Sequence, residues 1–263
     1  MTTPWPFPRV LAHRGGGSLA PENTIAAIRT GLGHGYRAVE FDAMLAADDT
    51  PVLMHDPTLD RTGLIGGAVS ALTAAALGAV DVGRWHSLPF MGESVPSLES
   101  ALRFCRAHDV WPNVEIKPAP GFESATGRAV ARVVAEVYAD LIRLGGDRAD
   151  NVQPSVPLLS SFSRAALSSA REAAPELPRG WLVPRLPSRW RESFAQMGCV
   201  SLHVNHRTLT ARLATEIKES GAWLFCYTVN STRRAQTLFS WGVDAFCTDS
   251  IARISATMQP QQK

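Results

Sequence analysis

Residues 10–24 read VLAHRGGGSLAPENT and begin with a short apolar run, Val10–Ala12, that has the composition of a β-strand. The run ends in His13 and Arg14, three glycines follow, and a helix is predicted over Glu22–Leu32. An imidazole and a guanidinium therefore lie at the carboxyl end of a strand, where α/β proteins usually carry their chemistry. The stretch predicts an α/β fold with a functional site at that end of its sheet.

The rest of the chain repeats this alternation of short apolar strands and helical stretches, which favours parallel strands joined by crossover helices. Seven further strands are predicted, at Ala38–Met44, Asn113–Lys117, Pro157–Phe162, Gly180–Val183, Val200–His203, Leu224–Thr228 and Ala245–Thr248. Six further helices are predicted, at Leu98–His108, Ala125–Leu144, Ser163–Ala173, Arg189–Met197, Ala211–Glu219 and Arg233–Trp241. Eight such strands in 263 residues predict a TIM (β/α)8 barrel, with an open doubly wound sheet as the alternative.

One extra strand, Pro51–His55, follows Met44 too closely for a crossover helix, so it must return antiparallel as a hairpin. A two-residue turn at Asp48-Asp49 is expected, because aspartate tolerates the left-handed backbone better than most residues. That register would place Asp42 directly opposite His55, with their Cβ atoms about 5 Å apart.

The segment 56–96 is long for a βα loop, is rich in glycine and carries one helical patch, Ser70–Leu77. Long insertions in compact domains are usually lids or small subdomains. Because this one follows the His55 strand, we expect it to lie over the mouth of the site. The predicted organisation is a single TIM-barrel domain over residues 1–258, with 56–96 as an inserted lid and 259–263 as a disordered tail.

The bulk composition narrows the range of partners. The net charge is +2, the pI is near 8.5, and no Lys/Arg cluster forms a basic stripe, which argues against nucleic acid. The N-terminal residues lack the pattern of a signal peptide, and no stretch approaches the roughly 18 apolar residues of a membrane span, so no stable membrane association is expected. Four dispersed cysteines without a C-x-x-C pair are typical of a reducing cytosol and predict a cytoplasmic location. The composition does not decide between a monomer and a homo-oligomer.

Strand alternation gathers the acidic residues on one face. Glu40 and Asp42 point to one side of their strand, and Glu115 and Lys117 share the inward face of the strand Asn113–Lys117. Three carboxylates in a barrel mouth would repel one another unless a cation balanced them. An all-oxygen ligand set suits Mg²⁺, Ca²⁺ or Mn²⁺ better than zinc, so a site for one divalent ion is predicted. The alternative is a set of buried ion pairs with Arg14 and Lys117.

Two histidines, His13 and His55, end neighbouring strands at the same edge of the sheet. Histidine titrates near neutrality, so such a pair can share the roles of general acid and general base. Arg14 offers a bidentate fork for phosphate, and Lys117 offers a point charge.

Motifs along nearly the whole chain, in the same order, resemble those of the glycerophosphodiester phosphodiesterase family of bacterial cytosolic type. Each motif is weak alone, but their number and order make the resemblance specific. The matching segments are His13–Gly15, Pro21–Thr24, Glu40–Asp42, Pro51–Asp56, Leu59–Thr62, Val95–Glu99, Asn113–Lys117, Ser160–Phe162, Thr228–Asn230, Gly242–Asp244 and Thr248-Asp249.

The resemblance implies a TIM barrel in which one divalent metal ion (Mg²⁺ or Ca²⁺, with Mn²⁺ as a further candidate) is held by Glu40, Asp42 and Glu115. It also implies an acid–base pair of histidines and two phosphate-binding cations, which are His13 and His55, and Arg14 and Lys117.

Three aromatic residues are weaker candidates for the pocket wall: Phe162, Tyr227 and Trp85. Tyr227 stands where the family commonly has tryptophan, which changes the stacking against the glycerol or alcohol group. His203 and His206, at and after the strand Val200–His203, are secondary candidates at the mouth.

The leading hypothesis is a cytosolic, metal-dependent hydrolase that converts glycerophosphodiesters, small-molecule substrates, into sn-glycerol 3-phosphate and an alcohol. One alternative is a phospholipase-like phosphodiesterase that acts on an intact lipid. Another is a catalytically silent, ligand-binding barrel, which would have lost a metal ligand or a histidine.

Overall fold

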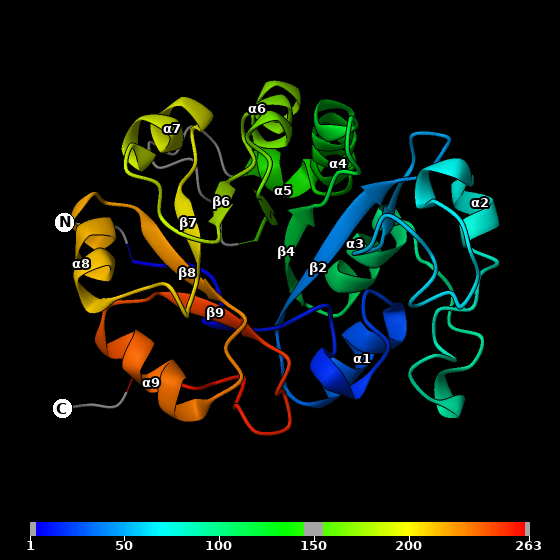
Figure 1. The fold of residues 1–263 in the computed structure, drawn as a ribbon, viewed down its shortest axis with the longest axis horizontal. Helices are drawn as coiled ribbons and strands as arrows, with labels where there is room; N and C mark the ends of the chain where they lie inside the picture. Colours follow the sequence, from blue (N-terminus) through cyan, green and yellow to red (C-terminus); the bar gives the residue numbers. More distant parts are fainter. Residues whose placement is uncertain (1–3, 145–154, 261–263) are drawn as a thin grey trace.

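A computed structural model describes residues 4–144 and 155–260, and its central feature is a closed barrel of parallel strands. Strand β1 pairs with β2 on one side and with β9 on the other, which closes the sheet on itself. Figure 1 shows the strands around a common centre with the helices outside. The barrel strands are β1 (Val10–Ala12), β2 (Ala38–Leu45), β4 (Trp111–Ile116), β5 (Leu158–Ser161), β6 (Arg179–Val183), β7 (Ser201–Asn205), β8 (Trp223–Tyr227) and β9 (Ala245–Thr248). The TIM-barrel prediction is confirmed, and closure excludes the open sheet.

The helices follow the predicted order with small differences at their ends. They are α1 (Ile25–Gly33), α3 (Leu98–Ala107), α4 (Glu123–Val137), α5 (Ala139–Leu144), α6 (Arg164–Ala173), α7 (Trp190–Met197), α8 (Ala211–Glu219) and α9 (Thr232–Ser240). Helix α1 begins later than predicted because the Thr24 hydroxyl caps it, accepting a hydrogen bond from the Ala27 amide. The helix predicted over Ala125–Leu144 is divided at Tyr138 into α4 and α5.

The barrel strands alternate between two faces as their sequences predict. Val39 and Phe41 of β2 lie in the apolar layer between the strands and the helices. Glu40 and Asp42 of the same strand are buried on the inner face. Strand β4 repeats the pattern, and the register sets Asp42 beside Glu115 as Cα partners. The period of two residues therefore delivers the acidic side chains to the barrel interior.

The observed register of the hairpin differs by one residue from the predicted register. Strand β3 (Pro51–Leu53) pairs with β2 so that Leu45 lies opposite Pro51. The Ala46 amide donates to the Thr50 carbonyl just beyond the two strands, which leaves a three-residue loop, Ala47–Asp49, at the turn. Asp49 adopts the left-handed conformation, with φ of 58°, as in hairpins that end a type I turn with a left-handed residue. Asp42 is consequently opposite Met54, whose amide donates to the Asp42 carbonyl. The predicted pairing of Asp42 with His55 is wrong.

The insertion 56–96 packs beside the hairpin around a small apolar core of its own. It contains the 3₁₀ turn η2 (Val69–Ala71), the short helix α2 (Ala74–Leu77) and the 3₁₀ turn η3 (Leu88–Phe90), so the helical patch predicted over Ser70–Leu77 is broken into two pieces. In Figure 1 the insertion lies on one side of the barrel, next to α3. Leu59 and Leu77 are buried against Met44 of β2.

Aromatic side chains close the amino end of the barrel. Phe7 stacks on Trp111 with ring centroids 4.2 Å apart, and Trp5 meets Trp223 edge to face at 5.5 Å. Among the described residues this end is filled with apolar side chains, which is typical of the end of a TIM barrel opposite the functional site.

No helix in residues 4–144 and 155–260 is long and apolar enough to cross a membrane. Of the tail predicted at 259–263, residues 261–263 lie outside the described residues.

A pair of glycines in α1 tests how tightly this helix packs on the loop after β1. A Cβ at the buried Gly31 would lie 2.3 Å from the Gly15 carbonyl oxygen, whereas one at Gly33 would meet nothing within 4 Å. We expect Gly31→Ala to lower the free energy of unfolding by about 1–3 kcal/mol, as overpacking does. Gly33→Ala should leave it unchanged or slightly higher. Chemical denaturation measures both, and equal stabilities would contradict the close packing.

Candidate active site

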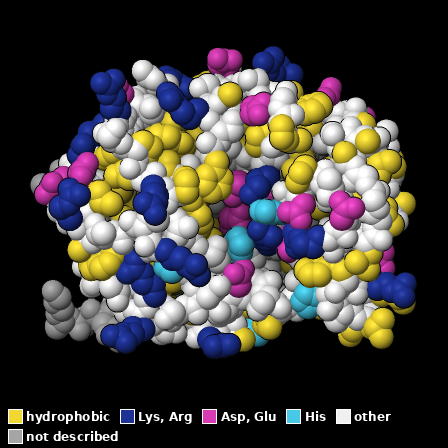
Figure 2. Space-filling view, viewed as in Figure 1, with side chains coloured by type: hydrophobic (Ala, Val, Ile, Leu, Met, Phe, Trp, Pro, Cys, Tyr) yellow, Lys and Arg dark blue, Asp and Glu magenta, His cyan; other side chains and the backbone are white. Residues whose placement is uncertain are grey.

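Three buried carboxylates meet at the carboxyl end of the barrel. Glu40 and Asp42 come from β2 and Glu115 from β4, and each offers an oxygen within 4.8 Å of the others. They are only 4%, 2% and 8% exposed. Figure 2 shows acidic, basic and histidine side chains gathered in a hollow at the centre of this face. The structure therefore brings together the three residues predicted to hold a metal ion.

The burial of these carboxylates changes their titration. Burial and the negative charge of Asp42 raise the pKa of Glu115 to about 8 and the pKa of Glu40 to about 7. Burial also tends to raise the pKa of Asp42, but the charges of Arg14 and Lys117 lower it overall. The donor set is all oxygen and its negative charge is incompletely balanced, so it fits a hard divalent cation.

His13 is held by an aspartate from the opposite end of the chain. Its Nδ1 lies 2.5 Å from Asp249 Oδ1, and its Nε2 lies 3.7 Å from Glu40 Oε2. Asn230 donates to the other oxygen of Asp249 and so fixes this carboxylate. Burial tends to lower the pKa of His13, but the hydrogen bond to Asp249 and the charge of Glu40 raise it overall.

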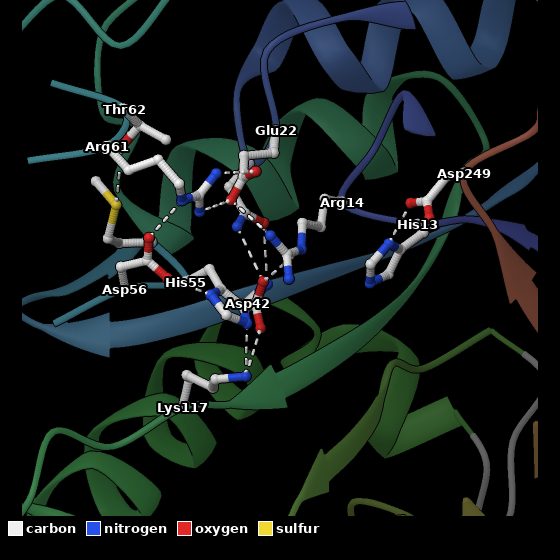
Figure 3. A network of polar contacts seen from close by, with 12 residues as sticks. His13, Arg14, Glu22, Asp42, His55, Asp56, Arg61, Thr62, Lys117 and Asp249 are labelled. Atoms are coloured by element: carbon white, nitrogen blue, oxygen red, sulfur yellow. Dashed lines mark hydrogen bonds and ion pairs between the residues drawn. The ribbon is translucent and has the colours of Figure 1, made fainter. Parts of the chain in front are cut away.

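His55 has the same arrangement with a different aspartate. Its Nδ1 lies 2.6 Å from Asp56 Oδ1, and its Nε2 lies 2.9 Å from Lys117 Nζ. Burial lowers the pKa of His55, and the positive charge of Arg14 lowers it further. Each histidine thus has Nδ1 bound to a carboxylate, with Nε2 turned toward the acidic cluster or its lysine (Figure 3).

The two predicted cations lie beside the cluster. The Arg14 amide donates to Glu40 Oε2, and its guanidinium lies 3.6 Å from Asp42. Arg14 has a φ of 50°, a conformation that a residue with a side chain rarely adopts, and functional sites often hold such residues. Lys117 Nζ lies 3.1 Å from Glu115 and 3.6 Å from Asp42.

A cavity of about 600 Å³ opens beside His13 and Arg14. Trp85 and His86 of the insertion form part of its wall, which places the insertion at the site. Phe162 and Tyr227 lie elsewhere, in an edge-to-face pair 5.7 Å apart with Lys117 Nζ 5.8 Å from the Phe162 ring. The aromatic candidates therefore divide between two sides of the acidic cluster.

The secondary histidines are not part of this arrangement. His203 is 1% exposed inside the barrel, where it contacts the Ser201 hydroxyl and stacks on Phe225, so the prediction that it lies at the mouth is wrong. His206 follows β7 next to Arg234, whose guanidinium donates to the His206 carbonyl.

Four charged residues of the site received no role from the sequence. Asp249 and Asp56 hold the histidines, and Glu22 forms ion pairs with both Arg14 and Arg61. All four lie within matched motifs. The acidic residue that directly follows His55 is a local signal, whereas the partner of His13 is 236 positions away along the chain.

The raised pKa of Glu115 makes the stability of the metal-free protein depend on pH. The folded state keeps the Glu115 proton up to about pH 8, whereas the unfolded chain loses it near 4.5, so this group makes folding less favourable as pH rises between these values. Relative to wild type, Glu115→Gln should gain about 1 kcal/mol or more in unfolding free energy between pH 5 and pH 8. Denaturant titrations in excess chelator measure the gain.

The matched control is Glu136→Gln, which changes an exposed glutamate of α4. It should show no such gain. If the unfolding free energies of Glu115→Gln and wild type change with pH in the same way, the raised pKa of Glu115 is contradicted.

The chain is similar to known proteins over most of its length. The glycerophosphoryl diester phosphodiesterase family matches residues 13–253. A glycerophosphodiester phosphodiesterase of Caldanaerobacter subterraneus subsp. tengcongensis is 29% identical over 245 residues, which cover 91% of this chain and 93% of the relative. The solved structure of an Oleispira antarctica phosphodiesterase, in complex with the product sn-glycerol-3-phosphate, is similar with a TM-score of 0.83 and 32% identity, and the match covers 95% of this chain and 96% of that one. The chain belongs to the glycerophosphoryl diester phosphodiesterase family.

Proposed function

We propose that this protein is a metal-dependent hydrolase that cleaves glycerophosphodiesters to sn-glycerol 3-phosphate and an alcohol. The observation that carries the proposal is the buried cluster of Glu40, Asp42 and Glu115, flanked by two histidines that are each held by an aspartate. Family membership supports the reaction class, and the Oleispira antarctica relative binds the corresponding product. A catalytically silent barrel is disfavoured because every predicted ligand and both histidines are present.

One divalent ion would be held by the three carboxylates, with Mg²⁺, Ca²⁺ and Mn²⁺ as the candidates. Bound there, it supplies Lewis-acid stabilisation of the negative charge on the phosphate. Arg14 and Lys117 lie on the same rim and would bind the remaining phosphate oxygens, Arg14 through its fork and Lys117 as a point charge.

His13 and His55 would share the proton transfers of the reaction. One takes the proton of the attacking hydroxyl, and the other protonates the departing alkoxide. Asp249 and Asp56 each hold Nδ1 of one ring, so Nε2 would be the atom that faces the substrate, and in His55 this atom lies beside Lys117 Nζ. This tautomer control requires both aspartates to stay ionised, and the pKa of each is below its usual range.

We assign the substrate's organic groups to the two aromatic sides of the cluster. Trp85 and the rest of the insertion 56–96 would control access to the cavity beside His13, while Phe162 and Tyr227 would form a wall beside Lys117. A cytoplasmic location is supported by the four cysteines, which are free and buried.

Removal of the metal provides the most direct test. Purified protein should release glycerol 3-phosphate from glycerophosphocholine when Mg²⁺, Ca²⁺ or Mn²⁺ is supplied, and lose this activity in excess EDTA. Glu40→Gln, Asp42→Asn and Glu115→Gln should each abolish turnover and the rise in melting temperature that the ion produces. Glu136→Gln should retain both. Full turnover after stripping the metal would overturn metal dependence.

The identity of the nucleophile can be tested with a modified substrate. Glycerophosphodiesters carry a free hydroxyl on the carbon next to the phosphate ester, and attack from within the molecule has a large proximity advantage. We expect this hydroxyl to attack, giving a cyclic glycerol phosphate that water then opens with the histidine roles reversed. A substrate methylated at that hydroxyl should be inert, and His13→Ala or His55→Ala should each cost at least ~10²-fold in kcat. Normal cleavage of the methylated substrate would instead favour direct attack by water.

A further inference from the structure

Arg61, a residue of the insertion, bonds to two carboxylates that belong to different loops of the site. Its Nε donates to Asp56 Oδ2 at 2.6 Å, and its two terminal nitrogens donate to the two oxygens of Glu22 at 2.7 Å each. Asp56 follows β3, whereas Glu22 precedes α1. A single guanidinium therefore connects the start of the insertion, just after β3, to the loop before α1 (Figure 3).

Each of these carboxylates also holds one residue of the proposed active site. Asp56 binds His55 Nδ1 through Oδ1, the oxygen that Arg61 does not use. Glu22 Oε1 accepts a hydrogen bond from the Arg14 guanidinium at 2.7 Å as well as one from Arg61. Two chains of hydrogen bonds therefore start at Arg61, one through Asp56 to His55 and one through Glu22 to Arg14.

The guanidinium suits this task better than any other side chain. Its donors lie in one rigid plane, so satisfying Glu22 with two of them also sets the direction of the third toward Asp56. The Arg61 guanidinium carbon lies 5.7 Å from the centre of the Trp85 ring, and the Trp85 indole donates to the Val82 carbonyl. The Trp85 ring, itself held by a hydrogen bond within the insertion, thus supports the Arg61 guanidinium.

Fold stability alone does not explain this arrangement. The Arg61 side chain is 43% exposed, and a partly exposed ion pair contributes little to the free energy of folding, although a bidentate pair in a charge network contributes more than an isolated one. The bonds instead fix the orientations of two carboxylates, and these orient a histidine and an arginine that face the same cluster.

We propose that Arg61 is a positioning residue that holds His55 and Arg14 in register with one another. The inference rests on the proposed function, because it assigns His55 to proton transfer and Arg14 to the phosphate. Arg61 itself does not touch the reacting atoms and acts only through Asp56 and Glu22.

The test compares Arg61→Gln with Arg84→Gln, which changes an exposed arginine of the same insertion outside this network. Partners that orient functional side chains typically contribute about 10- to 100-fold, so Arg61→Gln should lower kcat/KM for glycerophosphocholine by that factor. Arg84→Gln should leave it unchanged. Both variants should keep the melting temperature within a few degrees of wild type. Arg61→Lys keeps the charge without the fork and should recover only a small part of the loss.

Variants in the two chains of hydrogen bonds should have different kinetic effects. Asp56→Asn should mainly lower kcat, because it disturbs His55, whereas Glu22→Gln should mainly raise KM and weaken the binding of sn-glycerol 3-phosphate, because it disturbs Arg14. Arg61→Gln should show both effects. Adding Arg61→Gln to Asp56→Asn should lower kcat by much less than the product of the single effects, as expected of residues in one chain of contacts.

Each outcome supports or overturns one statement. If wild type turns over substrate and Arg61→Gln behaves like Arg84→Gln, the positioning role is wrong and the proposed function stands. Multiplicative effects in both double variants, Arg61→Gln with Asp56→Asn and with Glu22→Gln, would also overturn it. If wild type neither hydrolyses glycerophosphodiesters with any of the three ions nor binds sn-glycerol 3-phosphate, the proposed function fails and the inference fails with it.

Discussion

The mutual repulsion of three buried carboxylates is the constraint that organises this site. Glu40, Asp42 and Glu115 approach within 4.8 Å where little water can screen them, and only Asp42 has two cations close enough to keep its pKa low. Burial and the charge of Asp42 raise the pKa values of the other two carboxyls, so these keep their protons to higher pH. A cluster balanced entirely by ion pairs with Arg14 and Lys117 would have low pKa values throughout. The uneven titration therefore favours a cluster built to receive a further positive charge.

Strands and loops contribute different parts of the site. The register between β2 and β4 makes Asp42 and Glu115 neighbours, so the carboxylates that could bind metal lie on the most rigid elements of the fold. The carboxylates that hold the histidines come from the segments just beyond the strands, Asp249 after β9 and Asp56 after β3. Both bind Nδ1, so two unrelated loops impose the same tautomer on two rings. Through Arg61, the insertion then ties one of these loops to the segment that carries Arg14.

Local periodicity in the sequence made the acidic cluster predictable. Alternation along β2 and β4 was enough to place Glu40, Asp42 and Glu115 together, because a strand allows only two directions for a side chain. The hairpin register was mispredicted by one residue because Asp49 takes the left-handed conformation at the end of a three-residue loop, and another loop length fits the same letters equally well. Asp249, Glu22 and Arg61 received no role because their contacts join segments that become neighbours only after folding, and no periodic pattern records such a contact.

Closure of the barrel therefore helps to build the proposed site as well as the fold. The His13 amide donates to the Thr248 carbonyl at 3.0 Å, so the pairing of β1 with β9 that closes the barrel also carries Asp249 to the His13 ring. Just after His13, Gly17 has a φ of 56°, and a Cβ there would lie 2.3 Å from the Asp249 carbonyl oxygen. Only glycine allows the loop after β1 to approach the loop after β9 this closely. An open sheet with the same strands would keep the carboxylate cluster but leave His13 without the aspartate that fixes its tautomer. The acidic cluster is thus a property of two adjacent strands, whereas a complete histidine pair requires the whole chain.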